Sequence, residues 1–430
     1  MKKVSSNPCK VKQIEAENVL SSPELEPSVS ALDTRIALIQ ALIPLGLEAV
    51  ADELQKEVSR LTGEKNSRKG EKNPNRRWGS QPGSVYLSDQ KVSIQVPRVR
   101  NVDQNAEVPL DVYHQFQHPY RMDEGLLLRM LKGISTRSYE ACAETIPEAF
   151  GLSSSTVSSR FIKASAEKLR QFQERSLADY DLVALFLDGK SFADQEMIIA
   201  LGVTIDGHKI PLGFVQAVSE NERVCRQFID SLIDRGLQYH QGLLCLIDGS
   251  KGLYSALRKA LDGYVAIQRC QWHKRENVIA YLPKGEQEDV KKALQDAYDQ
   301  ETYKSAKAAL NALKPSLALM NESALKSLEE GFEETLTIHR LGLMPQLKLS
   351  FRTTNCIESL NSMVAQLTRN VKRWKNSNQR NRWLGTALLD IEPRLRKIKG
   401  YRFLPMLRLA LQKELKLETH GQYHQEIAAD

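Results

Sequence analysis

The chain has 430 residues, of which 41% are hydrophobic and 26% charged, and its formal net charge is +7. This is an ordinary globular composition, and the length is sufficient for two or three domains with a sizeable core. The most apolar stretch, from Ile36 to Leu47, is interrupted by Gln40 and Pro44, and residues 1–12 lack an apolar signal core, so we expect neither a membrane span nor export across a membrane.

Positive charge is concentrated towards the carboxyl end. From Arg340 to Lys413 there are 16 Lys and Arg residues against three acidic residues, a local net charge of +13, while the remainder of the chain is slightly acidic. Such segregation favours a polyanionic partner, because neutralising phosphates is the sequence-independent part of nucleic-acid affinity. A solvated basic helix face is the alternative.

Cysteine usage indicates the redox compartment. The six cysteines form no Cys-x-x-Cys pair and no secretory framework, so we expect reduced thiols, no disulfide bonds and a cytoplasmic protein. The cysteines are Cys9, Cys142, Cys225, Cys245, Cys270 and Cys356.

The first 120 residues predict a short series of elements. Residues 1–30 have no hydrophobic periodicity and predict a mobile tail, whereas 31–63 has the apolar spacing of one helix, or of two helices broken at Pro44. The basic stretch from Glu64 to Arg77 is typical of a linker, which could lie on DNA or be merely solvated. Alternating apolar residues from Gly83 to Arg100 predict a small β-hairpin, within a segment that spans 64–120.

Residues 121–178 predict a helical region that resembles a helix-turn-helix. One helix starts near Gly133 and ends near Thr145, a turn follows at Phe150 to Leu152, and Ser153 caps a second helix. The second helix would present small polar side chains and one Arg, which suit base edges or phosphates. An ordinary helical scaffold without DNA contact is the alternative. The outward residues would be Ser154, Ser155, Ser158 and Arg160.

From residue 179 the pattern becomes rich in strands. Five apolar runs predict strands, and Asp206-Gly207 predicts a hairpin between the second and the third. Three antiparallel strands, a helix, a parallel strand, a helix and a last strand is the order of an RNase H-like fold, in which the first and fourth strands are neighbours. The strands are Leu182 to Leu187, Met197 to Ile205, Ile210 to Gln216, Leu243 to Ile247 and Val265 to Gln268, with helices near Arg223 to Arg235 and Gly252 to Leu261.

Two of these strands stop at an Asp-Gly pair. Asp188-Gly189 follows the first strand and Asp248-Gly249 follows the fourth. If the strands lie side by side, both carboxylates converge at the carboxyl edge of the sheet. Like charges a few Å apart repel unless a divalent cation lies between them, and carboxylate oxygens suit Mg²⁺ or Mn²⁺. A plain turn after a strand is the alternative for each pair.

A third carboxylate is expected, because a two-metal phosphodiester site generally needs one. Residues 284–350 predict a helical insertion, and Glu358 lies shortly after it, ahead of basic helices that continue to about Lys416. The local sequence favours a different role for Glu358. With Thr354 or Asn355 as the N-cap, Glu358 stands where a capping-box glutamate would bind a backbone N–H.

Four motifs occur in order: Leu187-Asp188-Gly189, Ile247 to Gly252, Cys270 to Lys274, and Arg352 to Asn361. Together they resemble the mutator-type DDE transposases of bacterial insertion sequences, over a region from about Gly133 to Leu411. The resemblance implies that two divalent ions, Mg²⁺ or Mn²⁺, are held by a catalytic triad that cleaves and joins DNA. Carried over to this chain, the triad is Asp188, Asp248 and Glu358.

Cys270 and His273 form a Cys-x-x-His pair. A structural zinc ion needs about four ligands, and no second pair stands at a suitable spacing, so we do not expect zinc. The resemblance implies that the pair lies near the active centre, where His273 could contact a phosphate or help to organise the metal ions. A buried thiol and a helix-capping His are the alternative.

Aromatic and basic residues are the candidates for DNA contact. In the family a Trp often lies in the insertion and stacks on DNA, whereas residues 284–341 contain none. Trp374 and Trp383 lie among basic residues and are candidates for stacking, with core packing as the alternative. The DNA-binding residues that we expect are Ser155, Arg160, Arg352, Lys372, Arg373, Lys375, Arg380 and Arg382.

These expectations define an α/β protein with an RNase H-like catalytic domain, interrupted by an all-α insertion and preceded by a helix-turn-helix-like DNA-binding region. The catalytic domain would span 179–283 and 351–416, and 417–430 would be a tail. The partners would be double-stranded DNA, both terminal inverted repeats and target, bound at the bacterial nucleoid in the cytoplasm and away from any membrane. Because two DNA ends must meet, we expect a homodimer, with Leu32 to Leu61 as one contact.

Two rival functions remain open. A structure-selective nuclease of the same fold would cleave DNA without joining it. A non-catalytic DNA-binding protein derived from a transposase would bind DNA without cleaving it, although all three carboxylates are retained here.

Overall fold

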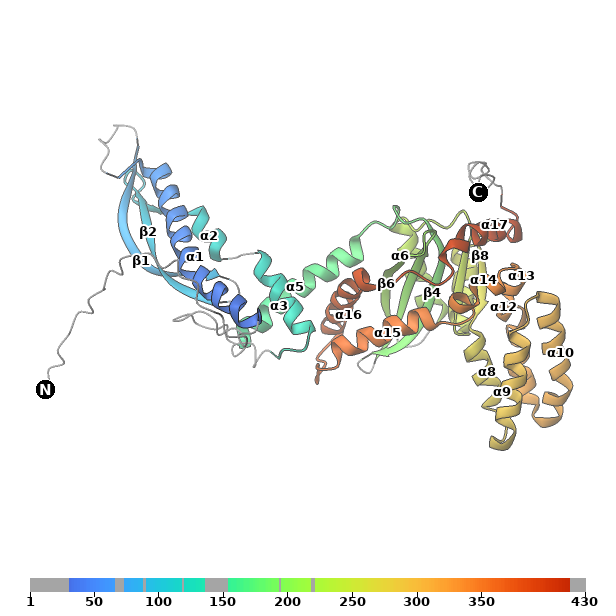
Figure 1. The fold of residues 1–430 in the computed structure, drawn as a ribbon. Helices are drawn as coiled ribbons and strands as arrows, with labels where there is room; N and C mark the ends of the chain where they lie inside the picture. Colours follow the sequence, from blue (N-terminus) through green and yellow to red (C-terminus); the bar gives the residue numbers. More distant parts are fainter. Residues whose placement is uncertain are drawn as a thin grey trace, which may run out of the picture. The chain divides into compact units, whose positions relative to one another are not determined.

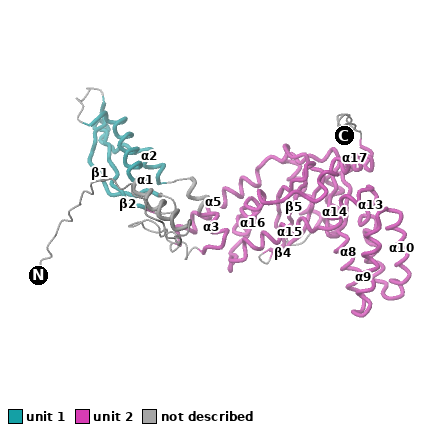
Figure 2. The backbone as a smooth tube through the Cα atoms, in the orientation of Figure 1, with its two compact units in different colours: residues 1–86, 92–118, 144–149 teal, residues 87–91, 119–143, 150–430 magenta. Residues whose placement is uncertain are grey.

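The structure is a computed structural model that describes residues 31–65, 73–87, 90–117, 120–135, 154–192, 195–217 and 221–417. It divides into two compact units (Figure 2). Unit 1 comprises residues 1–86, 92–118 and 144–149, and unit 2 comprises residues 87–91, 119–143 and 150–430. The expected tails at 1–30 and 418–430 lie outside the described residues.

Unit 1 combines a long helix with a three-stranded sheet (Figure 1). The helix α1 is continuous through Pro44, so the region predicted as one helix or two is one. Glu57 of α1 accepts the backbone N–H groups of Asp111 (2.9 Å) and Val112 (3.0 Å) and thereby satisfies the start of α2. The elements are α1 (Ala31–Thr62), β1 (Asn75–Leu87), β2 (Gln90–Asn101), β3 (Ala106–Val108) and α2 (Asp111–Gln117).

The basic stretch predicted as a linker is partly a strand. β1 begins at Asn75, so the carboxyl end of that stretch belongs to the sheet, and the predicted hairpin is longer than expected. Arg77 donates to Ser59 Oγ (3.0 Å) and to the carbonyl of Gly63 (3.0 Å). The linker prediction was wrong here because Arg77 finds acceptors at the carboxyl end of α1, where carbonyls lack helical partners. Residues 66–72 lie outside the described residues.

The expected helix-turn-helix falls mostly outside the described residues, because these omit 136–153 with Ser153 and the turn. α3 (Tyr120–Leu131) precedes this range and α5 (Ser154–Glu174) follows it. In α5, Val157 and Phe161 are buried, while Ala164 is half-buried. α5 packs against α3 and α16 within unit 2.

The main sheet of unit 2 has five strands in the order β6-β5-β4-β7-β8. β4, β5 and β6 are antiparallel, and β7 and β8 run parallel to β4. All five predicted strands are present, the hairpin turns at Gly207 (φ 90°), and the first and fourth strands are neighbours as expected. The elements are β4 (Leu182–Phe192), β5 (Gln195–Thr204), β6 (Lys209–Ala217), α6 (Glu222–Asp234), β7 (Leu243–Ile247), α7 (Lys251–Ala260) and β8 (Val265–Arg269).

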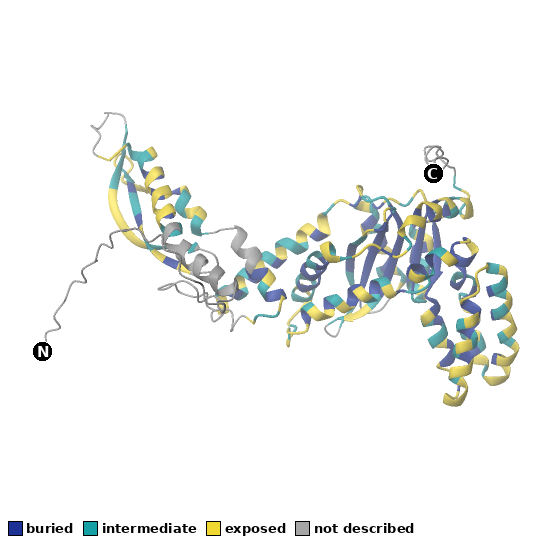
Figure 3. Ribbon diagram, viewed as in Figure 1, coloured by how far each residue is buried: buried dark blue, intermediate teal, exposed yellow. Residues whose placement is uncertain are grey.

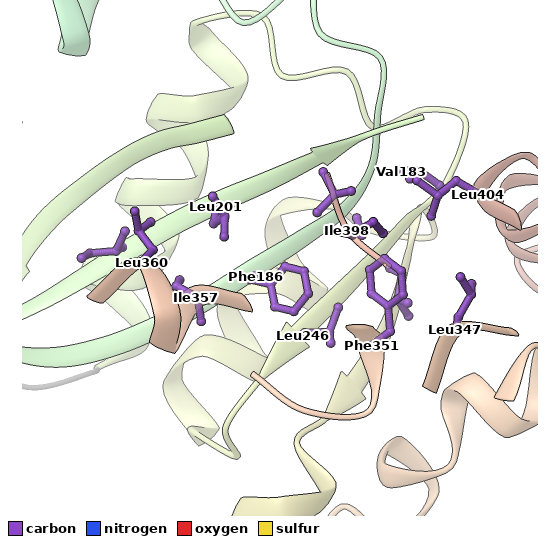
Figure 4. Close-up of a cluster of buried hydrophobic side chains, with 14 of the residues drawn as sticks. Val183, Phe186, Leu201, Leu246, Leu347, Phe351, Ile357, Leu360, Ile398 and Leu404 are labelled. Atoms are coloured by element: carbon purple, nitrogen blue, oxygen red, sulfur yellow. The ribbon is translucent and has the colours of Figure 1, made fainter. Parts of the chain in front are cut away.

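Helices cover both faces of this sheet, so β7 and β8 are buried throughout (Figure 3). On one face, Leu185 belongs to a core that includes α6 and α7. On the other face, Phe186 and Leu246 pack in a core with Ile357 of α15 (Asn355–Thr368) (Figure 4). Because side chains alternate along a strand, even-numbered positions near Phe186 and Leu246 point towards the α15 face.

A helical segment with its own hydrophobic core connects β8 to α15. Its main part begins at Lys284, where the insertion was predicted to start. Lys274 Nζ donates to the carbonyls of Ser327 (2.7 Å) and Glu330 (2.6 Å) and so joins α8 to α11. The helices are α8 (Gln271–Ile279), α9 (Lys284–Tyr298), α10 (Tyr303–Met320), α11 (Glu322–Glu329), α12 (Phe332–Thr335), α13 (Thr337–Arg340) and α14 (Met344–Phe351).

The carboxyl-terminal helices return to the sheet. α16 (Ser377–Ile391) packs beside α15, and α17 (Leu404–Glu414) contacts β4 and β7. Arg408 Nη2 donates to Asp181 Oδ1 (2.7 Å) and to the carbonyl of Leu182 (2.8 Å), which fastens α17 to the start of β4. In the described part of the chain, no helix combines the length and the apolar character that crossing a membrane requires.

Candidate active site

Asp188 lies where β4 loses one of its two neighbouring strands. β4 pairs with β7 from Ala184 to Phe186, and it continues beside β5 as far as Phe192, with Asp188 opposite Ile199. The prediction that this strand stops at Asp188 was therefore wrong, because β5 still supplies backbone hydrogen-bond partners beyond it. At Asp188, β4 therefore lacks a neighbouring strand only on the side where β7 has ended.

Asp248 follows β7 directly. The parallel register pairs Phe186 with Leu246, and the same sequence offset separates Asp188 from Asp248. Continuing the register by two residues aligns the two aspartates at the carboxyl end of the β4–β7 pairing. The Ser250 N–H donates to Asp248 Oδ1 (3.2 Å), so the predicted Asp-Gly turn is present together with the alignment.

Asp188 points to the face that α15 covers. Its side chain is 7% exposed, and Asn361 Nδ2 of α15 donates to Asp188 Oδ2 (2.9 Å). A carboxylate with so little contact with water needs hydrogen-bond donors, and Asn361 supplies one from the adjacent helix. This bond fixes the height of α15 over the strand, and with it the position of Glu358, which is three residues earlier on the same side of the helix.

Glu358 is bound by the residue that begins its helix. Thr354 is the N-cap of α15, and its hydroxyl donates to Glu358 Oε1 (2.6 Å). Glu358 is the fourth helical residue, and the Thr354 side chain makes no capping hydrogen bond to the backbone. The capping box favoured by the local sequence is thus absent, and the carboxylate is held by a neutral side chain instead.

The Cys-x-x-His pair lies against the same threonine. The backbone N–H of Cys270 donates to the carbonyl of Ile247 (2.8 Å). Because Ile247 directly precedes Asp248, this bond holds the backbone of Cys270 close to Asp248. Thr354 Oγ1 lies 3.5 Å from Cys270 Sγ and 3.4 Å from His273 Nδ1. Cys270 is buried and forms the N-cap position of α8, so the alternative of a buried thiol holds for it while His273 is not the cap.

Thr354 has one hydroxyl proton and therefore one bond to donate. The shortest contact, to Glu358, takes that proton, which leaves the lone pairs of Thr354 Oγ1 to accept from the His273 ring. The side chains of Cys270, His273, Thr354 and Glu358 consequently form one hydrogen-bonded group.

The electrostatics of this group favour positive charge on His273. Its hydrogen bond to Cys270 raises the pKa of His273 to about 9, burial opposes this, and the negative charges of Cys270, Asp248 and Glu358 add to the rise. Burial alone would raise the pKa of Cys270, but hydrogen bonds from the side chain and the backbone N–H of His273 bring it below its usual value. Two of the three candidate carboxylates thus act on one imidazolium.

Within the ranges that the structure describes, no group of three or more His, Cys, Asp and Glu side chains is arranged to hold a metal ion. Asp188 instead accepts from Asn361, and Glu358 accepts from Thr354. Each of these two carboxylates therefore has a neutral hydrogen-bond donor of its own.

The basic residues expected to bind DNA differ in exposure. Lys372, Arg373 and Lys375 are exposed in the connection between α15 and α16. Arg380 and Arg382 are half-buried on α16, and burial lowers the pKa of Arg382.

Other members of the expected DNA-binding set lie on α5 and at the end of α14. Ser155 is exposed and Arg160 is half-buried on α5. Arg352 forms an ion pair with Asp299 (2.6 Å), so its guanidinium is engaged within the protein.

The two candidate stacking tryptophans have different surroundings. Trp383 is 7% exposed and packs against Phe161 with ring centroids 4.8 Å apart, so core packing describes it. Trp374 is half-buried, and its ring lies 5.1 Å from that of Phe192 at the end of β4. Only Trp374 keeps a substantial exposed part.

Comparison with known proteins identifies the family. The family model described as Transposase, Mutator family, matches residues 25–396. The chain belongs to the Mutator family of transposases. This agrees with the resemblance stated from the four sequence motifs.

Curated proteins similar to this chain are named as transposases of insertion sequences. The chain is 27% identical over 322 residues to the transposase for insertion sequence element IS256 in transposon Tn4001 of Staphylococcus aureus, covering 70% of this chain and 77% of that protein. It is 27% identical over 362 residues to the transposase for ISRM5 of Rhizobium meliloti, covering 81% and 87%. It is 28% identical over 353 residues to the transposase for IS905 of Lactococcus lactis, covering 80% and 86%.

Sequence reasoning assigned no role to Asn361 or Trp272 at this site, and it considered Thr354 only as an N-cap. Asn361 binds Asp188, Thr354 binds Glu358, and Trp272 is 45% exposed with its ring 4.8 Å from that of His273. For Asn361 a signal existed, because a residue three positions after Glu358 shares its helix face. For Thr354 and Trp272 the positions became visible only once α15 and α8 were placed.

Proposed function

We propose that this Mutator-family protein binds the ends of an insertion sequence and catalyses metal-dependent cleavage and strand transfer with an RNase H-like domain. The observation that carries the proposal is the parallel register of β4 and β7, which, continued by two residues, brings Asp188 level with Asp248 just after β7. Glu358 supports it, because its helix packs on the sheet face towards which Asp188 points.

The donor set fits two Mg²⁺ or Mn²⁺ ions by its chemistry. Asp188, Asp248 and Glu358 supply hard carboxylate oxygens, which these cations prefer. When bound, such ions activate a water or a DNA 3′-hydroxyl and stabilise the leaving oxygen. Asn361 and Thr354 would then orient two of the ligands from behind, as hydrogen-bonded residues around metal sites commonly do.

His273, Cys270 and Thr354 would balance the charge of the carboxylates and hold the side chains of the site in position. The raised pKa of His273 favours its protonated form, whose imidazolium can partly offset the negative charge of Asp248 and Glu358 and can face a phosphate. Cys270 and Thr354 hold that ring in place. In this proposal the Cys-x-x-His pair serves the carboxylates rather than a separate zinc ion.

DNA binding is assigned to two surfaces of unit 2. Lys372, Arg373 and Lys375 supply exposed positive charge for phosphates in flanking or target DNA. The exposed start of α5, with Ser155, supplies small polar groups for the terminal repeats. Because transposition brings two ends together, we propose a homodimer on DNA.

The test is cleavage of a DNA duplex that carries the terminal repeat of the element encoding this chain. Asp188→Asn keeps the side-chain shape and removes the charge, so Mg²⁺-dependent nicking should disappear while end binding stays within a few-fold of wild type. Asp262→Asn, at an exposed turn after α7, is the matched control and should nick normally. Nicking retained by Asp188→Asn would refute the assignment.

Joined products separate the proposal from its rivals. A transposase yields strand-transfer products when a target duplex is added, whereas a structure-selective nuclease yields cleavage alone. A non-catalytic derivative would bind the ends and neither cut nor join them in Mg²⁺ or Mn²⁺.

A further inference from the structure

A cavity of about 210 Å³ lies beside Asp188 in unit 2. Lys190 lines it from β4, and since it is two residues beyond Asp188 it points to the same face of the sheet. Asn361, the hydrogen-bond partner of Asp188, lines it from α15. The cavity is therefore adjacent to the candidate active site, and Asn361 belongs to both.

The residues that line the cavity differ between its buried floor and its exposed mouth. Ile199 and Val364 are buried and make the floor apolar. Lys190 and Ala365 are exposed at the mouth. Trp374 forms a half-buried aromatic side. The cavity thus offers an apolar interior, a flat ring and one positive charge at its entrance.

Asn361 contributes a single unsatisfied acceptor. The residue is 5% exposed, and its Oδ1 has no hydrogen-bond partner among the described residues. The orientation of the amide is well defined, because the carboxylate of Asp188 can only accept and so must face Nδ2. A buried carbonyl oxygen without a donor is costly, so an occupant that supplies an N–H would be favoured here.

We propose that this cavity takes one unpaired nucleobase from the DNA strand that is cleaved. A base has flat apolar faces that can stack on Trp374, and its edge carries an N–H for Asn361 Oδ1. Its phosphate would remain outside, between Lys190 and the carboxylates. A free anion does not fit, because the interior is apolar and presents a carbonyl oxygen.

This inference rests on the proposed transposase function and adds the substrate nucleotide that the site would hold. A base in the cavity is linked to a phosphate at its mouth, and that mouth adjoins Asp188. Extrusion of one base therefore fixes the strand relative to the carboxylates, and it selects end sequences whose base pair opens easily.

The experiment combines a scan of the DNA with a block of the cavity. Ala365→Trp places a large side chain at the exposed mouth, and Gln366→Trp, next to it on the exposed side of α15 and outside the cavity wall, is the control. Each protein binds terminal-repeat duplexes in which successive nucleotides next to the cleaved bond are made abasic. Fluorescence anisotropy measures the affinity, and thermal melting checks that both variants fold.

For wild type, one abasic position should weaken binding roughly fivefold or more, as expected for the loss of one stacked base. Ala365→Trp should show a similar loss with intact DNA and no further loss at that position, while Gln366→Trp behaves like wild type. Additive losses, equal behaviour of the two variants, or a flat scan would overturn the inference. If wild type fails to prefer the terminal repeat over random DNA, the proposed function itself fails.

Discussion

Thr354 Oγ1 lies 2.6 Å from Glu358 Oε1 and 3.4 Å from His273 Nδ1, so one buried hydroxyl connects the third carboxylate to the Cys-x-x-His pair. The two motifs are far apart in the sequence. They meet because α8 begins where β8 ends and α15 begins at Asn355, and the backbone N–H of Gln271 donates to the carbonyl of Arg352 (2.9 Å) between them.

The hydroxyl of Thr354 should matter more than its shape. Thr354→Val keeps the volume and removes the donor, so we expect DNA cleavage to fall by roughly 10- to 100-fold, the usual effect of losing a residue that orients a metal ligand. Thr354→Ser keeps the donor and should stay within a few-fold of wild type. The Mg²⁺ concentration for half-maximal cleavage should rise for the Val variant alone. Equal behaviour of the two variants would contradict a positioning role.

Divalent ions should stabilise the folded protein through the carboxylates. Mn²⁺ at about 100 times its dissociation constant would add about 2.7 kcal/mol to the free energy of unfolding for one site. The Asp248→Asn variant should lose most of the resulting rise in melting temperature, whereas Asp262→Asn should keep it. An unchanged rise in Asp248→Asn, measured by calorimetry without DNA, would count against metal binding at this residue.

The exposed basic connection between α15 and α16 should set the salt dependence of DNA binding. Replacing Lys372 and Arg373 by Gln should reduce the slope of log affinity against log salt by about 0.9 for each phosphate that the variant no longer neutralises. Lys284 and Lys292, exposed on α9, are the control pair, and their replacement should leave the slope unchanged. Anisotropy titrations from low to moderate salt measure the slope. Identical slopes for both double variants would rule out the connection as a DNA contact.

Lys274 should make the free energy of unfolding depend on pH in the alkaline range. Burial, aided by Arg269 and opposed by Glu330 and Glu334, lowers the pKa of Lys274 from 10.5 to about 8. Between these values the unfolded chain holds a proton that the folded chain has released, so the free energy of unfolding should rise with pH by up to about 3 kcal/mol.

The neutral amine still has two N–H groups for the carbonyls of Ser327 and Glu330, so its two hydrogen bonds survive deprotonation. Lys274→Met lacks the titrating group, and urea unfolding at pH 8 and pH 10 should show a smaller rise for it than for wild type. The same rise in both proteins would mean that Lys274 is not the cause.

Much of the fold follows from local pattern. Apolar runs located all five strands of the main sheet, because a strand with both faces covered must be apolar along its length. The hairpin at Gly207 and the start of the helical insertion at Lys284 were also predictable, since positive φ and helical spacing leave clear sequence signals.

The linker prediction failed for a reason that lies in distant residues. Arg77 belongs to a strand and donates hydrogen bonds to the carboxyl end of α1. The local sequence around Arg77 does not show that another element supplies these acceptors. The continuation of β4 past Asp188 was missed for the same reason, because β5 provides the pairing.

By itself the sequence determined which carboxylates to consider and that two of them end apolar runs, because a strand with both faces covered must be apolar along its length. The order of strands and helices predicted that the two strands are neighbours. Only the tertiary structure decided what each carboxylate binds. Asn361 faces Asp188, and Thr354 faces Glu358 instead of capping a helix. Those bonds depend on the height and rotation of α15 over the sheet, which are fixed by packing of Ile357 against residues some 170 positions away such as Phe186.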